Sequence, residues 1–101
     1  MEFKIDSRGS ETLVVCTGRM MFADTSEFLR LSEDIKLSDG KVWVLEFSDL
    51  AFIDSAGLGM LLMIRELIET QSGKVSIRGA AGQVRKALDL AKFQELICIE
   101  T

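Results

Sequence analysis

The sequence lacks histidine entirely, and its 101 residues also contain no proline and no tyrosine. Without an imidazole, neither a Ser-His-Asp nor a Cys-His catalytic arrangement can form, and His-ligated zinc or haem is excluded as well. The chain also lacks the one side chain that ordinarily titrates near neutral pH. Most routine hydrolase chemistry is therefore excluded.

Cysteine is scarce, with only Cys16 and Cys98, each inside a short apolar run. No C-x-x-C motif is present, so the sequence does not predict a thioredoxin-like redox site. We expect both thiols to be free and buried in adjacent strands.

Positive charge and long apolar runs are also limited. Sixteen acidic residues outweigh twelve basic ones, for a net charge of −4, and the only basic pair of note is Arg85-Lys86. Nucleic acid is therefore not an expected partner. The longest apolar run, residues 60–64, is far too short to span a bilayer, and residues 1–6 do not resemble a signal peptide. We expect a soluble cytoplasmic protein without direct membrane insertion.

Hydrophobic residues make up 48% of the chain, which is enough for one core. A chain of this length buries roughly two-thirds of the surface that its unfolded form exposes, so it can fold alone as one domain over residues 1–101.

The apolar pattern predicts a hairpin followed by alternating helices and strands. Strands are expected over residues 3–6 and 12–17, the second ended by Gly18. Asp24 is a candidate cap for a helix, with Glu27 completing a capping box. The inward positions of this helix are Phe28, Leu31 and Ile35.

The second half of the chain continues the alternation. The apolar run 42–45 is typical of a central strand covered on both faces. A helix over residues 56–70, a strand over 74–78, a helix over 82–92 and a strand over 97–99 follow. We expect the last helix to bury Val84, Leu88 and Ala91. The order β-β-α-β-α-β-α-β indicates an α/β fold, with a mixed sheet of four to five strands and about three main helices.

One segment, residues 54–59 with the sequence Asp-Ser-Ala-Gly-Leu-Gly, stands where open α/β folds place their sites, just after a buried strand. Ser55 is a candidate N-cap for the following helix. Gly57 and Gly59 each cost roughly 1 kcal/mol in a helix, which suggests a close backbone approach. A helix N-terminus also favours a phosphate group.

The same helix is more apolar than one buried face requires. At helical spacing Leu58 and Leu62 fall beside Arg65 and Glu69, on the side expected to be wet. They are candidates for a partner-docking surface. Since no histidine is available to activate Ser55, this serine is a candidate phosphate acceptor and not a catalytic nucleophile.

The segment Asp54 to Gly59, its place after a buried strand and the order of elements together resemble the STAS domain. Within it, the chain is similar to stand-alone bacterial anti-sigma factor antagonists. The resemblance covers essentially the whole chain. It extends to the loop after the second strand, where Gly18, Met20 and Phe22 stand, and to Gly79.

The resemblance implies a partner switch that controls transcription, is not an enzyme and uses no metal or cofactor. The unphosphorylated protein would bind an anti-sigma factor or related serine kinase. That kinase would phosphorylate Ser55, and a PP2C-type phosphatase would restore it. Asp54, Ala56, Gly57 and Gly59 would form the environment of the phosphorylation site.

The loop at residues 20–22 departs from the family pattern, since Met21 stands where many members have an acidic residue. Met20, Met21 and Phe22 make the loop unusually apolar. Either these side chains tuck under the sheet, or they widen the docking surface.

Two alternatives stay open at this point. One is a STAS subunit bound permanently to the ATPase of a bacterial lipid-transport ABC system, which would not need a phosphorylatable serine. The other is a module that binds a small ligand, such as a nucleotide or a lipid, at the helix terminus that carries Ser55.

Overall fold

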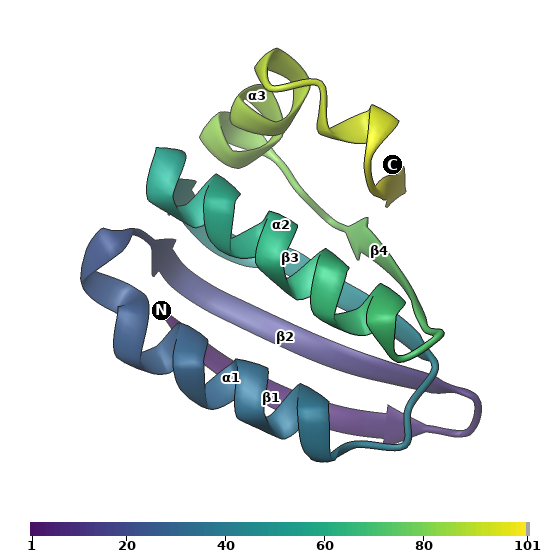
Figure 1. The fold of residues 1–101 in the computed structure, drawn as a ribbon. Coiled ribbons are helices and arrows are strands. Elements are labelled where there is room, and N and C mark those ends of the chain that lie inside the picture. The colour runs from purple at the N-terminus through teal and green to yellow at the C-terminus, as the bar shows by residue number, and fades with distance from the viewer. Residues whose placement is uncertain (101) are drawn as a thin grey trace.

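The computed structural model describes residues 1–100, which form a five-stranded sheet and a layer of helices (Figure 1). The strands are β1 (Glu2–Arg8), β2 (Glu11–Met20), β3 (Val42–Ile53), β4 (Lys74–Arg78) and β5 (Cys98–Glu100). The helices are α1 (Thr25–Leu37), α2 (Ser55–Thr70) and α3 (Gly82–Leu90), with short 3-10 turns η1 (Phe22–Asp24) and η2 (Phe93–Glu95). The predicted fold class and element order are confirmed.

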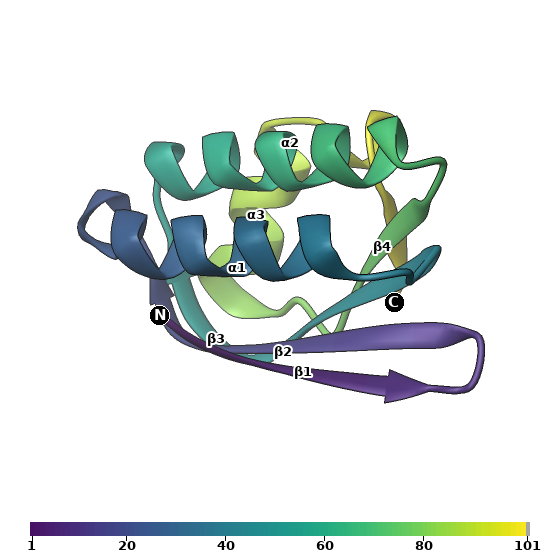
Figure 2. The ribbon, with the colours of Figure 1, turned by 60° about the horizontal axis from the view of Figure 1, so that its bottom comes forward.

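The strands lie in the sheet in chain order, with β1 antiparallel to β2 and all later neighbours parallel. Each parallel pair is joined through a helix, and such crossovers are almost always right-handed. Because every crossover steps in the same direction across the sheet, α1, α2 and α3 lie on the same face (Figure 2).

Within residues 1–100 the other face carries no helix, so the prediction that the central strand is covered on both faces was wrong. Val44 points to this open face and is nonetheless only 4% exposed. It lies opposite Leu13 on β2 and Ser76 on β4, so residues of the neighbouring strands flank it on both sides. The continuous apolar run 42–45 therefore does not require a second layer of helices.

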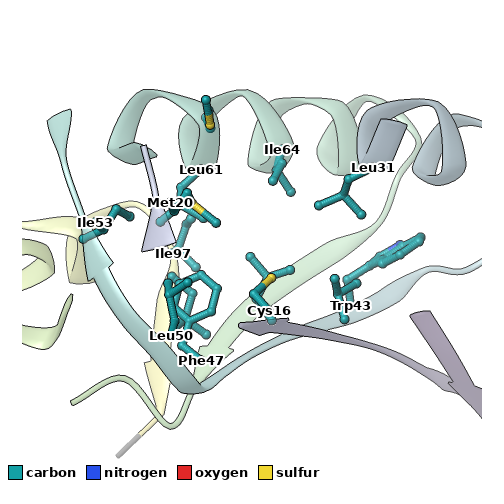
Figure 3. Packing of buried hydrophobic residues seen from close by; sticks show 14 of the residues in the cluster. Cys16, Met20, Leu31, Trp43, Phe47, Leu50, Ile53, Leu61, Ile64 and Ile97 are labelled. Atoms are coloured by element: carbon teal, nitrogen blue, oxygen red, sulfur yellow. The ribbon is translucent and has the colours of Figure 1, made fainter. Parts of the chain in front are cut away.

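The core lies between the sheet and the helices (Figure 3). Phe28, Leu31 and Ile35 of α1 are buried as predicted, and so are Val84 and Leu88 of α3. Ala91 is exposed, contrary to the prediction, because α3 ends at Leu90 and the chain then turns. Phe93 takes the inward position instead.

Two further expectations need correction. Gly18 does not end β2, which continues to Met20 through shifts in register against β3 on either side of Gly18. The two thiols differ, because Cys16 is buried whereas Cys98 is exposed, and their strands β2 and β5 are not adjacent.

Candidate functional site

The site lies at the end of β3, where Asp54 leads into α2. The N-cap of α2 is Asp54 and not Ser55, since the Asp54 Oδ1 accepts a hydrogen bond from the Gly57 N–H at 2.8 Å. Ser55 is the first residue inside the helix. A carboxylate at this position satisfies a free N–H and also complements the positive end of the helix dipole.

Ser55 is exposed on the first turn of α2. Within residues 1–100 its hydroxyl takes part in no hydrogen bond, because Asp54 has taken over the capping role that the sequence suggested for Ser55. The hydroxyl is therefore accessible at the surface.

The two glycines of the motif differ. A Cβ on Gly57 would meet the carbonyl oxygen of Met20 and would lie 2.6 Å from Cγ1 of Ile53, so the close approach predicted here is confirmed. A Cβ on Gly59 would meet nothing within 4 Å. The close approach expected at Gly59 is absent from the described chain.

The end of β2 packs directly against the start of α2. The Asp54 N–H donates to the Met20 carbonyl at 3.2 Å, and the Phe22 N–H lies 3.4 Å from Asp54 Oδ2. Asp24 is the N-cap residue of α1, as predicted, but its side chain makes no capping hydrogen bond to that helix. Its carboxylate accepts from the Met21 N–H at 2.8 Å and closes the η1 turn instead.

The three apolar residues of this loop, Met20, Met21 and Phe22, differ in how far they are buried. Met20 is fully buried beneath α2, near Leu61 and Ile53 (Figure 3), so its predicted place on a docking surface was wrong. The last position of β2 points inward, and this packing lets Gly57 approach the loop. Met21 is partly buried, and Phe22 is 76% exposed. Both expectations for the loop thus hold in part: Met20 tucks in, and Phe22 stays outside.

Gln83 is a site residue that sequence reasoning missed. Its side-chain oxygen accepts from the Ile53 N–H at 2.9 Å, and its amide donates to the Ile53 carbonyl at 2.8 Å. The Gln83 side chain thus makes the two backbone hydrogen bonds that a neighbouring strand would make at the end of β3, and it holds α3 beside Ser55. The only signal was an amide in the first turn of α3, which is too common to single out.

A shallow groove of about 470 Å³ lies between the first turn of α2 and α3. Ser55 and Asp54 form one wall, and the apolar lining includes Leu58, Ala87 and Leu90. Leu90 is 76% exposed, Leu62 is 38% exposed, and Leu58 is partly buried against the core. The predicted surface near Leu58 and Leu62 thus continues onto α3.

The described part of the chain contains no cluster of three or more His, Cys, Asp or Glu side chains that could hold a metal ion. Nor does any helix within residues 1–100 have the length and apolar character needed to cross a membrane.

Comparison with solved structures shows the same fold. SpoIIAA, an anti-sigma factor antagonist, in its unphosphorylated form superposes with a TM-score of 0.79, at 19% identity over 99% of this chain and 89% of that one. An anti-sigma factor antagonist from Mycobacterium paratuberculosis superposes with a TM-score of 0.85, at 13% identity over 97% of this chain and 83% of that one. A sulfate transporter family protein from Wolinella succinogenes superposes with a TM-score of 0.74, at 20% identity over 87% of this chain and 71% of that one.

Sequence comparison points the same way. A STAS-domain containing protein of Pseudomonas aeruginosa (strain UCBPP-PA14) is 26% identical over 91 residues, which cover 90% of this chain and 89% of that protein. The family model described as "Mlab, STAS domain" matches residues 3–98. The chain therefore belongs to the STAS-domain family.

Proposed function

We propose that this protein is an anti-sigma factor antagonist that works as a phosphorylation-controlled partner switch. With Ser55 unmodified it binds an anti-sigma factor or related serine kinase in the cytoplasm, and phosphorylation of Ser55 releases that partner. A PP2C-type phosphatase returns the protein to its binding form. The observation that carries the proposal is the exposed, unbonded Ser55 hydroxyl beside an apolar groove.

The charge added at Ser55 accounts for the release. A phosphoryl group brings about −1.5 to −2 charges at neutral pH. It would stand next to the Asp54 carboxylate, on a chain whose net charge is already −4. A partner covering the groove would have to desolvate this dianion near a second carboxylate, which opposes binding.

The fold itself tolerates the same charge. Ser55 lies in the first turn of α2, where the helix dipole favours negative charge. Its side chain is exposed, so a phosphate there displaces no packed group. Release then requires only local repulsion and desolvation, without rearrangement of the domain.

The docking surface would consist of Leu58, Leu62 and Leu90, with Phe22 and Met21 on the neighbouring loop. Because Gly59 has open space where its Cβ would stand, a partner could approach the α2 backbone closely there.

A second candidate is a STAS subunit that does not switch, such as the partner of a transport ATPase. The specific observation in its favour is that the matching family model is described by the name Mlab and not as an anti-sigma factor antagonist. The solved sulfate transporter family protein likewise shows that this fold occurs outside antagonists. Such a subunit could use the same groove but would not depend on modification of Ser55.

The first test is affinity purification of the tagged protein from the cells that produce it, followed by phosphopeptide mass spectrometry on the Ser55 peptide. We expect a phosphorylated fraction of the wild type and a serine-kinase-type protein that co-purifies with it. Ser55→Ala should retain the partner, whereas Ser55→Asp should lose it at least tenfold in yield. Thermal unfolding of both variants should stay close to that of the wild type.

Leu62→Ala and Leu61→Ala give a matched control for docking. Leu62 is 38% exposed, so Leu62→Ala should weaken capture of the partner with little loss of stability. Leu61 is fully buried, so Leu61→Ala should lower the free energy of unfolding by the 2–5 kcal/mol typical of buried leucine truncation. Strong partner capture by Ser55→Asp would refute the switch. Co-purification with membrane ABC components, with Ser55 unphosphorylated, would establish the second candidate instead.

A further inference from the structure

The strand β1 forms one edge of the sheet and is paired on one side only, with β2 (Figures 1 and 2). All seven of its residues except Phe3 are exposed. An edge strand of this length offers unpaired N–H and C=O groups to another strand. Its residues therefore decide what, if anything, can pair with it.

The turn between β1 and β2 determines which backbone groups face the free edge. Gly9 and Ser10 form a two-residue loop, and Gly9 has φ +60°, as expected for the first central residue of a type II′ turn. In such a turn the flanking residues, Arg8 and Glu11, form the hydrogen-bonded pair. Since hydrogen-bonded pairs alternate along an antiparallel ladder, the free edge carries the backbone groups of Phe3, Ile5 and Ser7.

The side chains of β1 are divided between the two faces of the sheet. Phe3 and Ile5 lie opposite Cys16 and Val14, so they point to the helix side. Phe3 is partly buried, with the Arg30 guanidinium 4.8 Å from its ring centroid, and Ile5 is 37% exposed. The open face receives the four charged residues of β1, namely Glu2, Lys4, Asp6 and Arg8.

These charges are self-complementary about Ile5. In an antiparallel pair of two β1 strands with Ile5 opposite Ile5, Glu2 lies opposite Arg8 and Lys4 lies opposite Asp6. By symmetry every charged residue of β1 then faces an opposite charge, which favours cross-strand pairing. The same register places the outward backbone groups of Phe3, Ile5 and Ser7 opposite one another, as a hydrogen-bonded ladder requires.

The neighbouring registers are disfavoured by the same residues. A shift that sets Lys4 opposite Lys4 also sets Glu2 opposite Asp6. A shift that sets Asp6 opposite Asp6 also sets Lys4 opposite Arg8. Both registers place like charges directly opposite, which is destabilising. Registers centred on Phe3 or on Ser7 also set opposite charges against each other, but each pairs only two of the four charged residues and leaves part of the strand unpaired. The register centred on Ile5 is therefore the symmetric register that pairs all four.

We propose that β1 is a dimerisation edge, which pairs antiparallel with β1 of a second copy of this chain in the register centred on Ile5. The contact is isologous, so it closes after two copies and joins two five-stranded sheets into one. Both helical layers then lie on the same side of the joined sheet. The exposed Asp6–Arg8 ion pair seen in the single chain, at 2.7 Å, would be exchanged for the intermolecular pairs.

This edge shares no residue with the groove beside Ser55. The dimer therefore leaves the groove itself free on both copies. Partner binding and dimerisation can be tested separately, and failure of one says nothing about the other.

Charge reversal tests the register by sedimentation equilibrium. The wild type should show a concentration-dependent dimer of the 11.2 kDa chain. Lys4→Glu alone or Asp6→Lys alone places like charges opposite each other twice, so each should weaken dimerisation at least about tenfold. The double variant Lys4→Glu, Asp6→Lys restores both pairs and should recover the dimer. Mixing the two single variants should produce a heterodimer.

Lys74→Glu is the matched control, because Lys74 is exposed on β4, away from this edge. It should leave the dimer unchanged, and circular dichroism should show that every variant is folded. A wild type that stays monomeric at the highest soluble concentration would overturn the proposal. So would single reversals without effect, or a double variant that fails to dimerise although folded.

Discussion

Gly57 and Gly59 are two residues apart in the same helical turn, yet they serve different ends. The Cα of Gly57 faces the Met20 carbonyl and the Ile53 side chain, so no side chain fits there. Gly59 faces open space. Both carry the usual cost of glycine in a helix, but only at Gly57 does the packing of this domain require it.

Alanine at these two positions should therefore have opposite effects. Gly57→Ala should destabilise the fold by about 1–3 kcal/mol. The new methyl group would push the Met20 backbone away from α2, and this cost exceeds the gain in helix propensity. Gly59→Ala should be neutral or stabilising by up to about 1 kcal/mol. Urea denaturation of the two variants measures the difference. Equal destabilisation by both would show that Gly59 is also closely packed in this fold.

At the scale of elements, the start of α2 is held by contacts that cross from one segment to another. Asp54 caps the helix through Gly57 and also meets the loop after β2, while Gln83 of α3 bonds both backbone groups of Ile53. Three segments distant in sequence thus fix the orientation of the turn that carries Ser55.

Removing the cap tests this arrangement. Asp54→Ala should lower the free energy of unfolding by about 1 kcal/mol, because it leaves the Gly57 N–H without its partner and removes a favourable charge at the helix N-terminus. Asp54→Asn keeps a capping oxygen and should lose less. Chemical denaturation gives both values. An alanine variant as stable as the wild type would mean that water replaces the carboxylate at no cost.

At the scale of the whole molecule, one face of the sheet is covered by helices and the other is open. The two cysteines lie on opposite faces of the sheet and therefore differ in exposure. Cys16 points under the helices and is 1% exposed, and burial raises the pKa of its thiol to about 12. Cys98 is exposed on β5, opposite Ser76.

Thiol titration should therefore distinguish the two residues. With a disulfide reagent at pH 8, one thiol per chain should react rapidly, and the second only on unfolding, since the thiolate is the reactive form and Cys16 is both buried and protonated. Cys98→Ser should abolish the rapid phase, and Cys16→Ser should retain it. Rapid reaction of both thiols in the folded protein would contradict the burial of Cys16 beneath the helices.

The order of elements and the STAS-like signature were readable from the sequence because they rest on local patterns. Period-two alternation marks β4, helical spacing marks the buried faces of α1 and α2, and Asp54 to Gly59 follows a strand directly. The errors concern partners distant in sequence. Ala91, Met20 and Cys98 were misplaced because their exposure depends on where a helix stops and on which side of the sheet a strand presents them.

The sequence by itself determined the fold class, the lack of imidazole chemistry and the location of the motif around Ser55, since each is a property of residue types and their spacing. Only the tertiary structure decided that Asp54 and not Ser55 caps α2, that Gln83 closes the end of β3, and that Phe22 and Leu90 stay outside while Met20 goes in. The physical reason is that hydrogen bonding and burial at this site join β2, β3, α2 and α3, and such contacts exist only once the chain has folded.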